Sequence, residues 1–230
     1  MTRLTTPSAD ATACWSTFGV EGQPLLCVDD CLPDPDAVVA FASDREFVPI
    51  GQYYPGVRLP VGEASAMALI ERWLPDMQAR FDLPGPPTFA ECFLSLVTTA
   101  PGDLAPIQRL PHFDGVERER IAVLLYLDRK ERGGTAFYRQ RSTGYESVTA
   151  DRQARYTAAL RDGVERHGLP PARYIAGDTP MFERVHAVEG RFNRLIAYRG
   201  NALHCADLAG GFEPVTAPAS GRLTLNLFLH

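Results

Sequence analysis

Three residues of the chain have the types and spacing of a metal-binding group. His112 and Asp114 stand two apart in the segment LPHFDG, and His204 follows much later in NALHCAD. On an extended backbone, residues two apart point the same way, so the imidazole and the carboxylate of the first pair face one point. A second imidazole from a distant strand would complete a two-histidine, one-carboxylate triad, which binds iron(II) on one face and leaves positions open for substrates.

The last segment, RLTLNLFLH, alternates leucine with other residues and therefore reads as a strand with two different faces. Arg222, Thr224 and Asn226 share the face opposite the leucines. This polar face either meets water, as in an ordinary half-buried strand, or lines the inside of a barrel. In the second case Arg222 and Thr224 would bind the distal carboxylate of a 2-oxo acid, because a guanidinium makes paired hydrogen bonds to a carboxylate.

The other reactive residue types favour structural roles. The five cysteines are sparse and unevenly spaced, which is typical of free buried thiols and not of a zinc site. His167 precedes a glycine at a predicted helix end, and His186 lies inside a predicted strand. Asp207 follows His204 by three residues and is either a hydrogen-bond partner of that imidazole or a turn cap. Arg58, in the segment YYPGVRLP, is more typical of a structural arginine than of a substrate contact.

The overall composition excludes several classes of protein. The chain has 230 residues, 45% hydrophobic and 22% charged, with a net charge of −5. Such a composition is globular and offers no broad cationic surface for nucleic acid or an anionic membrane. The sequence has neither a long apolar stretch nor a signal-peptide core, so we expect a cytoplasmic protein without membrane contact. The sequence says nothing about its oligomeric state.

Helical and strand patterns divide the chain into two regions. Helices are predicted at 34–44, where Asp34 caps and Pro35 follows, at 63–81 with a break near Pro75, and at 151–168. The segment 50–60 is rich in glycine and proline and is predicted as an irregular loop. Strands are predicted at 24–28, 92–99, 121–128, 134–140, 182–188, 194–200 and 222–230. We expect a mainly β fold, a double-sheet jelly roll supported by helices.

The order of these motifs resembles a known enzyme superfamily. The segments PHFDG, RIAVLLYLDRKERGGTAFYR, YRGNALHCADL and GRLTLNLFLH follow one another as in the iron(II)/2-oxoglutarate dioxygenases of the prolyl-hydroxylase-like type. The segment YYPGVRLP is similar to an uncharacterised bacterial branch of that superfamily. The resemblance implies that His112, Asp114 and His204 bind iron, and that Arg222, Thr224 and Tyr126 bind 2-oxoglutarate.

The resemblance also implies an architecture and an activity. The chain would be a single domain, 1–230, with a helical support region at 1–88 and a double-stranded β-helix, or jelly-roll, core at 89–230. The helix at about 150–168 would be an insertion into that core. The activity would be hydroxylation of an amino acid, a peptide or a small natural product with Fe(II), 2-oxoglutarate and O₂.

Two alternatives remain open from the residues alone. A cupin-type metal enzyme would use the triad without 2-oxoglutarate and would not need Arg222. A jelly-roll binding protein would use the fold without catalysis and would bind neither iron nor 2-oxoglutarate.

Overall fold

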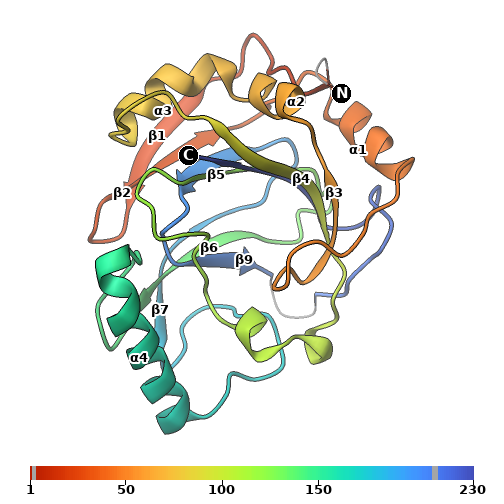
Figure 1. Ribbon diagram of the computed structural model, residues 1–230. Helices are drawn as coiled ribbons and strands as arrows, with labels where there is room; N and C mark the ends of the chain where they lie inside the picture. The colour runs from red at the N-terminus through yellow and green to blue at the C-terminus, as the bar shows by residue number, and fades with distance from the viewer. Residues whose placement is uncertain (2–3, 209–211) are drawn as a thin grey trace.

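Most strands of the protein join one large antiparallel sheet. The computed structural model describes residues 1, 4–208 and 212–230. The large sheet has seven strands in the order β1-β2-β8-β5-β10-β4-β3 (Figure 1). Their bounds are β1 Ala13–Phe18, β2 Gln23–Val28, β3 Gly56–Pro60, β4 Phe89–Val97, β5 Ile121–Tyr126, β8 Leu195–Arg199 and β10 Leu223–Leu229.

A smaller sheet packs against one face of the large one. It has three antiparallel strands in the order β7-β6-β9, with bounds β6 Gly134–Gln140, β7 Phe182–Val188 and β9 His204–Asp207. Phe137 of β6 and Val188 of β7 form one buried cluster with Tyr126, Tyr198 and Phe228 of the large sheet. The space between the two sheets is therefore partly filled by aromatic side chains, and polar groups reach it from both sides.

The opposite face of the large sheet is covered by helices. They are α1 Pro35–Ser43, α2 Glu63–Ala68 and α3 Leu74–Arg80, with the 3₁₀ turn η2 Glu71–Trp73 between the last two. The leucines of β10 and the odd-numbered residues of β5 pack there with the helices in the largest apolar cluster. Strand β10 therefore has an apolar face toward the helices and a mixed face toward the small sheet, as its alternation predicts.

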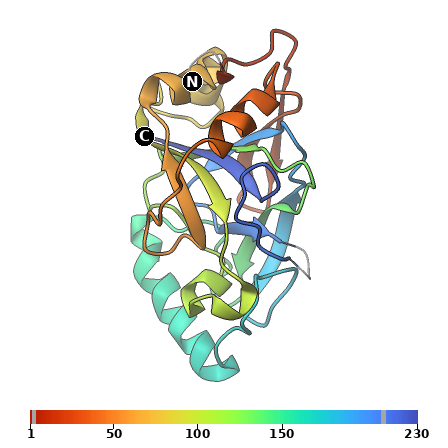
Figure 2. The same ribbon diagram turned by 90° about the vertical axis from the view of Figure 1, so that its right-hand side faces the viewer.

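A fourth helix lies at the other end of the molecule. Helix α4, Ala150–His167, begins and ends one residue before the predicted stretch 151–168, and it packs Tyr156 and Leu160 against Tyr138 and Phe182 of the small sheet. Figures 1 and 2 show α1–α3 and α4 at opposite ends, with both sheets between them. Two 3₁₀ turns, η3 Pro101–Asp103 and η4 Pro106–Arg109, precede the segment that contains His112. No helix in the described ranges is both long and apolar enough to span a bilayer.

The observed elements confirm a mainly β fold and correct two local predictions. Helix α1 begins as expected, because the Asp34 carboxylate accepts the Ala37 N–H at 3.0 Å. The prediction of an irregular loop over 50–60 is wrong at its end, because β3 pairs there with β4. Strand β1 was also missed, so the first 88 residues supply three strands of the large sheet as well as helices. Strands β1 and β3 are the two edge strands of the large sheet, and the sequence pattern of an edge strand is weaker because only one of its sides is paired.

A buried carboxylate holds the β1–β2 turn against the small sheet. The Glu146 side chain is fully buried and accepts the N–H groups of Val20 and Glu21 at 3.1 and 3.0 Å. Its charge is balanced by Arg139, whose Nε donates at 2.9 Å. The same arginine also pairs with Glu183, which is 40% exposed.

We predict that Glu146→Ala lowers the free energy of unfolding by about 1–3 kcal/mol, because two backbone N–H groups lose their acceptor and Arg139 keeps only its more exposed partner Glu183. Glu183→Ala removes an exposed partner of the same Arg139 and should cost at most about 1 kcal/mol. Urea denaturation of both variants measures the difference. Equal losses would show that burial of Glu146 does not set its contribution.

Candidate metal centre

The backbone brings the two distant histidines together. His112 and His204 are opposite each other in an isolated antiparallel bridge, in which each N–H donates to the other's carbonyl at 2.8 Å. Two residues on, the Asp114 N–H donates to the Gly200 carbonyl at 2.7 Å. Residues opposite each other in such a bridge project their side chains to the same side. The backbone pairing therefore explains why the H-x-D segment and the distal histidine meet.

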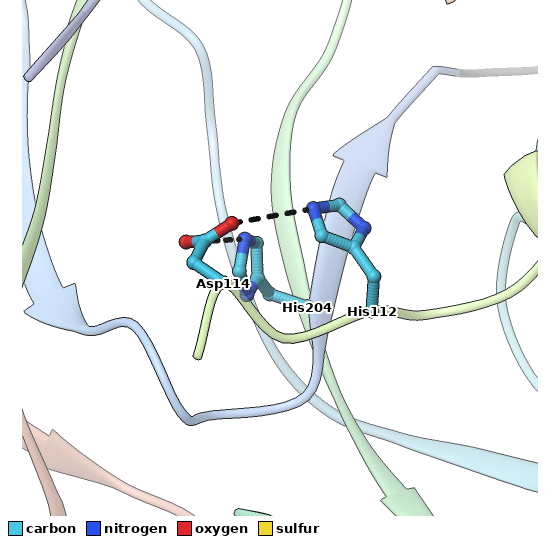
Figure 3. A group of neighbouring side chains, drawn as sticks. All are labelled: His112, Asp114 and His204. Atoms are coloured by element: carbon cyan, nitrogen blue, oxygen red, sulfur yellow. Dashed lines mark ion pairs between the residues drawn. The ribbon is translucent and has the colours of Figure 1, made fainter. Parts of the chain in front are cut away.

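The three side chains converge on one point between the sheets. Nε2 of His204 lies 3.5 Å from Oδ2 of Asp114, and Nε2 of His112 lies 3.9 Å from Oδ1 of the same carboxylate (Figure 3). One ligand atom from each of the three residues lies within 4.8 Å of the others. The structure thus brings together all three residues that the sequence analysis selected as a metal-binding group.

The hydrogen bonding of His204 fixes which nitrogen faces the centre. Its Nδ1 lies 2.8 Å from the Ala202 carbonyl, which can only accept, so Nδ1 carries the proton. In the neutral imidazole, Nε2 then presents a lone pair to Asp114, and two acceptors face each other. Burial lowers the pKa of His204 to about 4, and the bond to Ala202 opposes only part of that shift. The centre therefore lacks a cation at neutral pH.

Asp114 and His112 differ from His204 in their exposure to solvent. The Asp114 side chain is 14% exposed, and its Oδ2 accepts no hydrogen bond among the residues described. Desolvation raises the pKa of this carboxyl, although the charges of His112, Arg120 and Arg58 lower it in part. Desolvation and the neighbouring His204 imidazole lower the pKa of His112. About half of the His112 side chain remains exposed, so the centre opens to solvent on that side.

Arg222 points between the sheets, toward the same interior. It is 5% exposed, and its Nη2 donates to the Gly134 carbonyl of β6 at 3.0 Å. Its Nε is buried without a hydrogen-bond partner, and in the described part of the chain no carboxylate forms an ion pair with it. A buried guanidinium without an anion is costly, and this cost is usually offset by a ligand or a paired carboxylate.

The other two residues predicted beside Arg222 also face inward. Thr224 is buried and donates its hydroxyl to Oδ1 of Asn226 at 2.6 Å. Tyr126 lies opposite Thr224 on the neighbouring strand, and its hydroxyl is 2.7 Å from the Thr135 hydroxyl. Burial raises the pKa of Tyr126 to about 12. These two side chains thus have protein partners, whereas Arg222 keeps free donors.

A glycine pair and a buried aspartate shape the turn beneath Arg222. A Cβ on Gly134 would lie 1.7 Å from the Val188 carbonyl, and Gly133 has φ +88°. Asp128 accepts the N–H groups of Lys130 and Arg132 at 3.0 and 3.1 Å and pairs with the Arg132 side chain. Asp128 was not among the residues selected from the sequence. Its position at a strand end before two glycines is nevertheless typical of an aspartate that accepts hydrogen bonds from the backbone of a turn.

Other residues considered from the sequence lie outside the centre. His167 is exposed at the end of α4, and His186 stacks on Phe18 with ring centroids 5.6 Å apart. Asp207 pairs with Arg184 at 3.2 Å, so the partner of His204 is the Ala202 carbonyl instead.

The low pKa of His204 makes the stability of the metal-free protein depend on pH. An unfolded histidine titrates near pH 6.5, so between about pH 6.5 and 4 the unfolded state binds a proton that the folded state does not. Stability should therefore fall as the pH falls through this window, by at most about 1.4 kcal/mol per pH unit from this residue. We expect urea denaturation of EDTA-treated protein to show a shallower pH dependence in His204→Gln. Exposed His167→Gln should keep the parent slope, and equal slopes in all three proteins would contradict the shifted pKa.

Comparisons with known proteins give a family and distant structural similarities. A search among curated proteins by sequence found no match. Solved structures with a similar arrangement include an N-substituted L-amino acid dioxygenase from Burkholderia ambifaria AMMD, at 13% identity and a TM-score of 0.44, covering 95% of this chain and 94% of that one. AviO1 from Streptomyces viridochromogenes Tue57 has 13% identity and a TM-score of 0.45, covering 99% and 91%. The non-heme alpha-ketoglutarate-dependent epimerase SnoN from nogalamycin biosynthesis has 14% identity and a TM-score of 0.45, covering 89% and 77%. The model of a family of unknown function, DUF6445, matches residues 9–229, and the chain belongs to that family.

Proposed function

We propose that this protein is an Fe(II)/2-oxoglutarate-dependent oxygenase that hydroxylates an amino acid, a peptide or a small natural product. The observation that carries the proposal is a pair of unbalanced groups in one interior. A His-Asp-His cluster, with His204 buried and His112 open to solvent, lacks a cation, and a buried arginine, Arg222, lacks an anion. A divalent metal chelated by a dicarboxylic 2-oxo acid supplies both charges at once.

The strand order supports a double-stranded β-helix core for this enzyme. From β4 onward the chain passes back and forth between the sheets, with β4, β5, β8 and β10 in the large sheet and the consecutive pair β6–β7, then β9, in the small one. The His112 segment pairs beside β9, and β6 and β7 complete the second sheet. Two four-stranded antiparallel layers connected in this way make a jelly roll, which can hold a ligand between its sheets.

The donor set fits iron(II). Two neutral imidazoles and one carboxylate form the facial triad typical of non-heme iron oxygenases. We propose His112, Asp114 and His204 as the metal ligands. The Ala202 carbonyl would hold the His204 ring in the tautomer that keeps Nε2 free, as outer partners of metal-bound histidines do.

The polar side chains on the inward face of β5 and β10 suit 2-oxoglutarate. We propose that Arg222 binds the distal carboxylate through its free donors, with the Thr224 and Tyr126 hydroxyls beside it. The Gly134 carbonyl would keep the guanidinium oriented through its contact with Nη2. Because a desolvated guanidinium stays charged, it would bind a carboxylate strongly in this interior.

Iron with 2-oxoglutarate and dioxygen, when bound, supplies the oxidation of an unactivated C–H bond. The residues of the chain would hold the metal on one face, orient the oxo acid through Arg222 and exclude water with the aromatic cluster between the sheets. The exposed side of His112 would be the side from which the substrate enters.

The direct test is anaerobic titration of the purified protein with Fe(II) and then 2-oxoglutarate. We expect a visible metal-to-ligand charge-transfer band. Changes at outer partners of metal ligands typically cost about 10–100-fold in metal affinity, so Ala at His112, Asp114 or His204 should cost more. His167→Ala, at an exposed position, should bind iron like the parent. Iron binding without a band would favour a cupin-type enzyme, and binding of neither would favour a non-catalytic protein.

A separate titration tests the role of Arg222 in binding 2-oxoglutarate. Removing one partner of a buried charge pair costs about 2–5 kcal/mol, so Arg222→Ala should raise the 2-oxoglutarate requirement by about thirty-fold or more while iron still binds. Arg222→Lys should recover part of the affinity, because a point charge cannot make paired hydrogen bonds. Arg161→Ala, at an exposed position of α4, is the control. Parent-like titration of Arg222→Ala would move the oxo-acid site elsewhere.

A further inference from the structure

A second arginine without an anionic partner faces the interior near the triad. Arg58 lies on β3, opposite Ser95 of β4, and Ser95 in turn lies opposite Thr224 of β10. These residues form one row across the large sheet, so Arg58 stands at the edge of the face that carries the proposed oxo-acid pocket.

Two aromatic rings fix the plane of the Arg58 guanidinium. Its central carbon lies 4.1 Å from the ring centroid of Tyr54 and 5.0 Å from that of Phe93. Contact with two rings restricts how the planar group can turn, and the N–H donors of a guanidinium lie along its edge. The charge is therefore oriented before any ligand arrives.

The edge donors of Arg58 lack a protein acceptor. Within the described ranges its side chain makes no hydrogen bond and no ion pair, and its Nε is buried without a partner. Two carboxylates of the described residues interact electrostatically with Arg58, but each has another partner: Glu91 forms an ion pair with Arg120 at 3.3 Å, and Asp114 belongs to the triad.

Arg58 and Arg222 are separate sites for negative charge. Arg222 precedes β10 and donates to the Gly134 carbonyl of the small sheet, whereas Arg58 lies two strands away on β3 and, in the described part of the chain, makes no side-chain hydrogen bond to that sheet. A single 2-oxoglutarate chelating the metal has one distal carboxylate and would use one arginine. The other arginine is then available to a second anion at the same centre.

We propose that Arg58 binds a carboxylate of the molecule that is oxidised, so that the substrate is a carboxylate-bearing small molecule. A planar, edge-presenting guanidinium matches a carboxylate through two parallel hydrogen bonds. This inference rests on the proposed oxygenase function, and it assigns Arg58 to substrate specificity.

The test uses probes that differ only in charge. The anaerobic Fe(II)·2-oxoglutarate complex is titrated with N-acetyl-L-amino acids covering the common side chains, and with the matched primary amides. We expect at least one acid to perturb the charge-transfer band, and its amide to bind at least ten-fold more weakly. Arg58→Gln should lose at least ten-fold in affinity for that acid while the band itself still forms, which also shows that the variant is folded. Arg58→Lys should recover part of the loss.

Arg45→Gln is the matched control, because Arg45 is also stacked on a ring, that of Phe41 at 3.9 Å, but is exposed on the helix side. It should respond like the parent. The proposal is wrong if no acid perturbs the band, if the amides bind as well as the acids, or if Arg58→Gln keeps the parent affinity. Failure of the band to form in the parent, scored before any acid is added, would instead overturn the oxygenase function.

Discussion

The two backbone hydrogen bonds between His112 and His204 are the contact on which the rest of the centre depends. His112 lies outside the regular strands, and His204 is the first residue of β9. The two hydrogen bonds join them and so align two imidazoles that are far apart in sequence. The Asp114 N–H continues the alignment by donating to Gly200. Because the ligand side chains are placed by main-chain pairing, their relative positions follow from the sheet and do not require a metal to assemble them.

Around this contact the protein keeps charges that it does not balance. Four charged residues of the described ranges have a buried donor or acceptor atom without a hydrogen-bond partner: Asp114, Arg222, Arg58 and Arg120, which packs against Gly115. Elsewhere buried carboxylates are paired, as Glu146 is with Arg139 and Asp128 with Arg132. Unpaired buried charge destabilises a fold, so its restriction to one interior argues for ligands there and against a general tolerance of poor pairing.

The sequence predicted those parts that local patterns control. The alternation of β10 indicated two unlike faces, and the Asp34-Pro35 start placed α1 correctly. The edge strands β1 and β3 were missed, because glycine and proline obscure the strand pattern of β3 and because most residues of β1 are exposed or only partly buried. The triad could be selected from residue types, but its convergence depends on a long-range bridge that no local pattern encodes. The N-terminal 88 residues supply β1, β2 and β3 to the main sheet as well as the helices that cover it.

Arg58 illustrates the limit of sequence reasoning most clearly. As a residue in a segment rich in glycine and proline it resembles any structural arginine, and nothing in its neighbours marks a ligand. Only the register of β3 against β4 sets it across from Ser95 and beside the polar row of β10. The specificity of an enzyme of this kind would then depend on an edge strand, while its chemistry depends on residues at and between the central strands. Edge strands tolerate sequence change better than central ones, since only one side is paired, so substrate preference can diverge while the centre is retained.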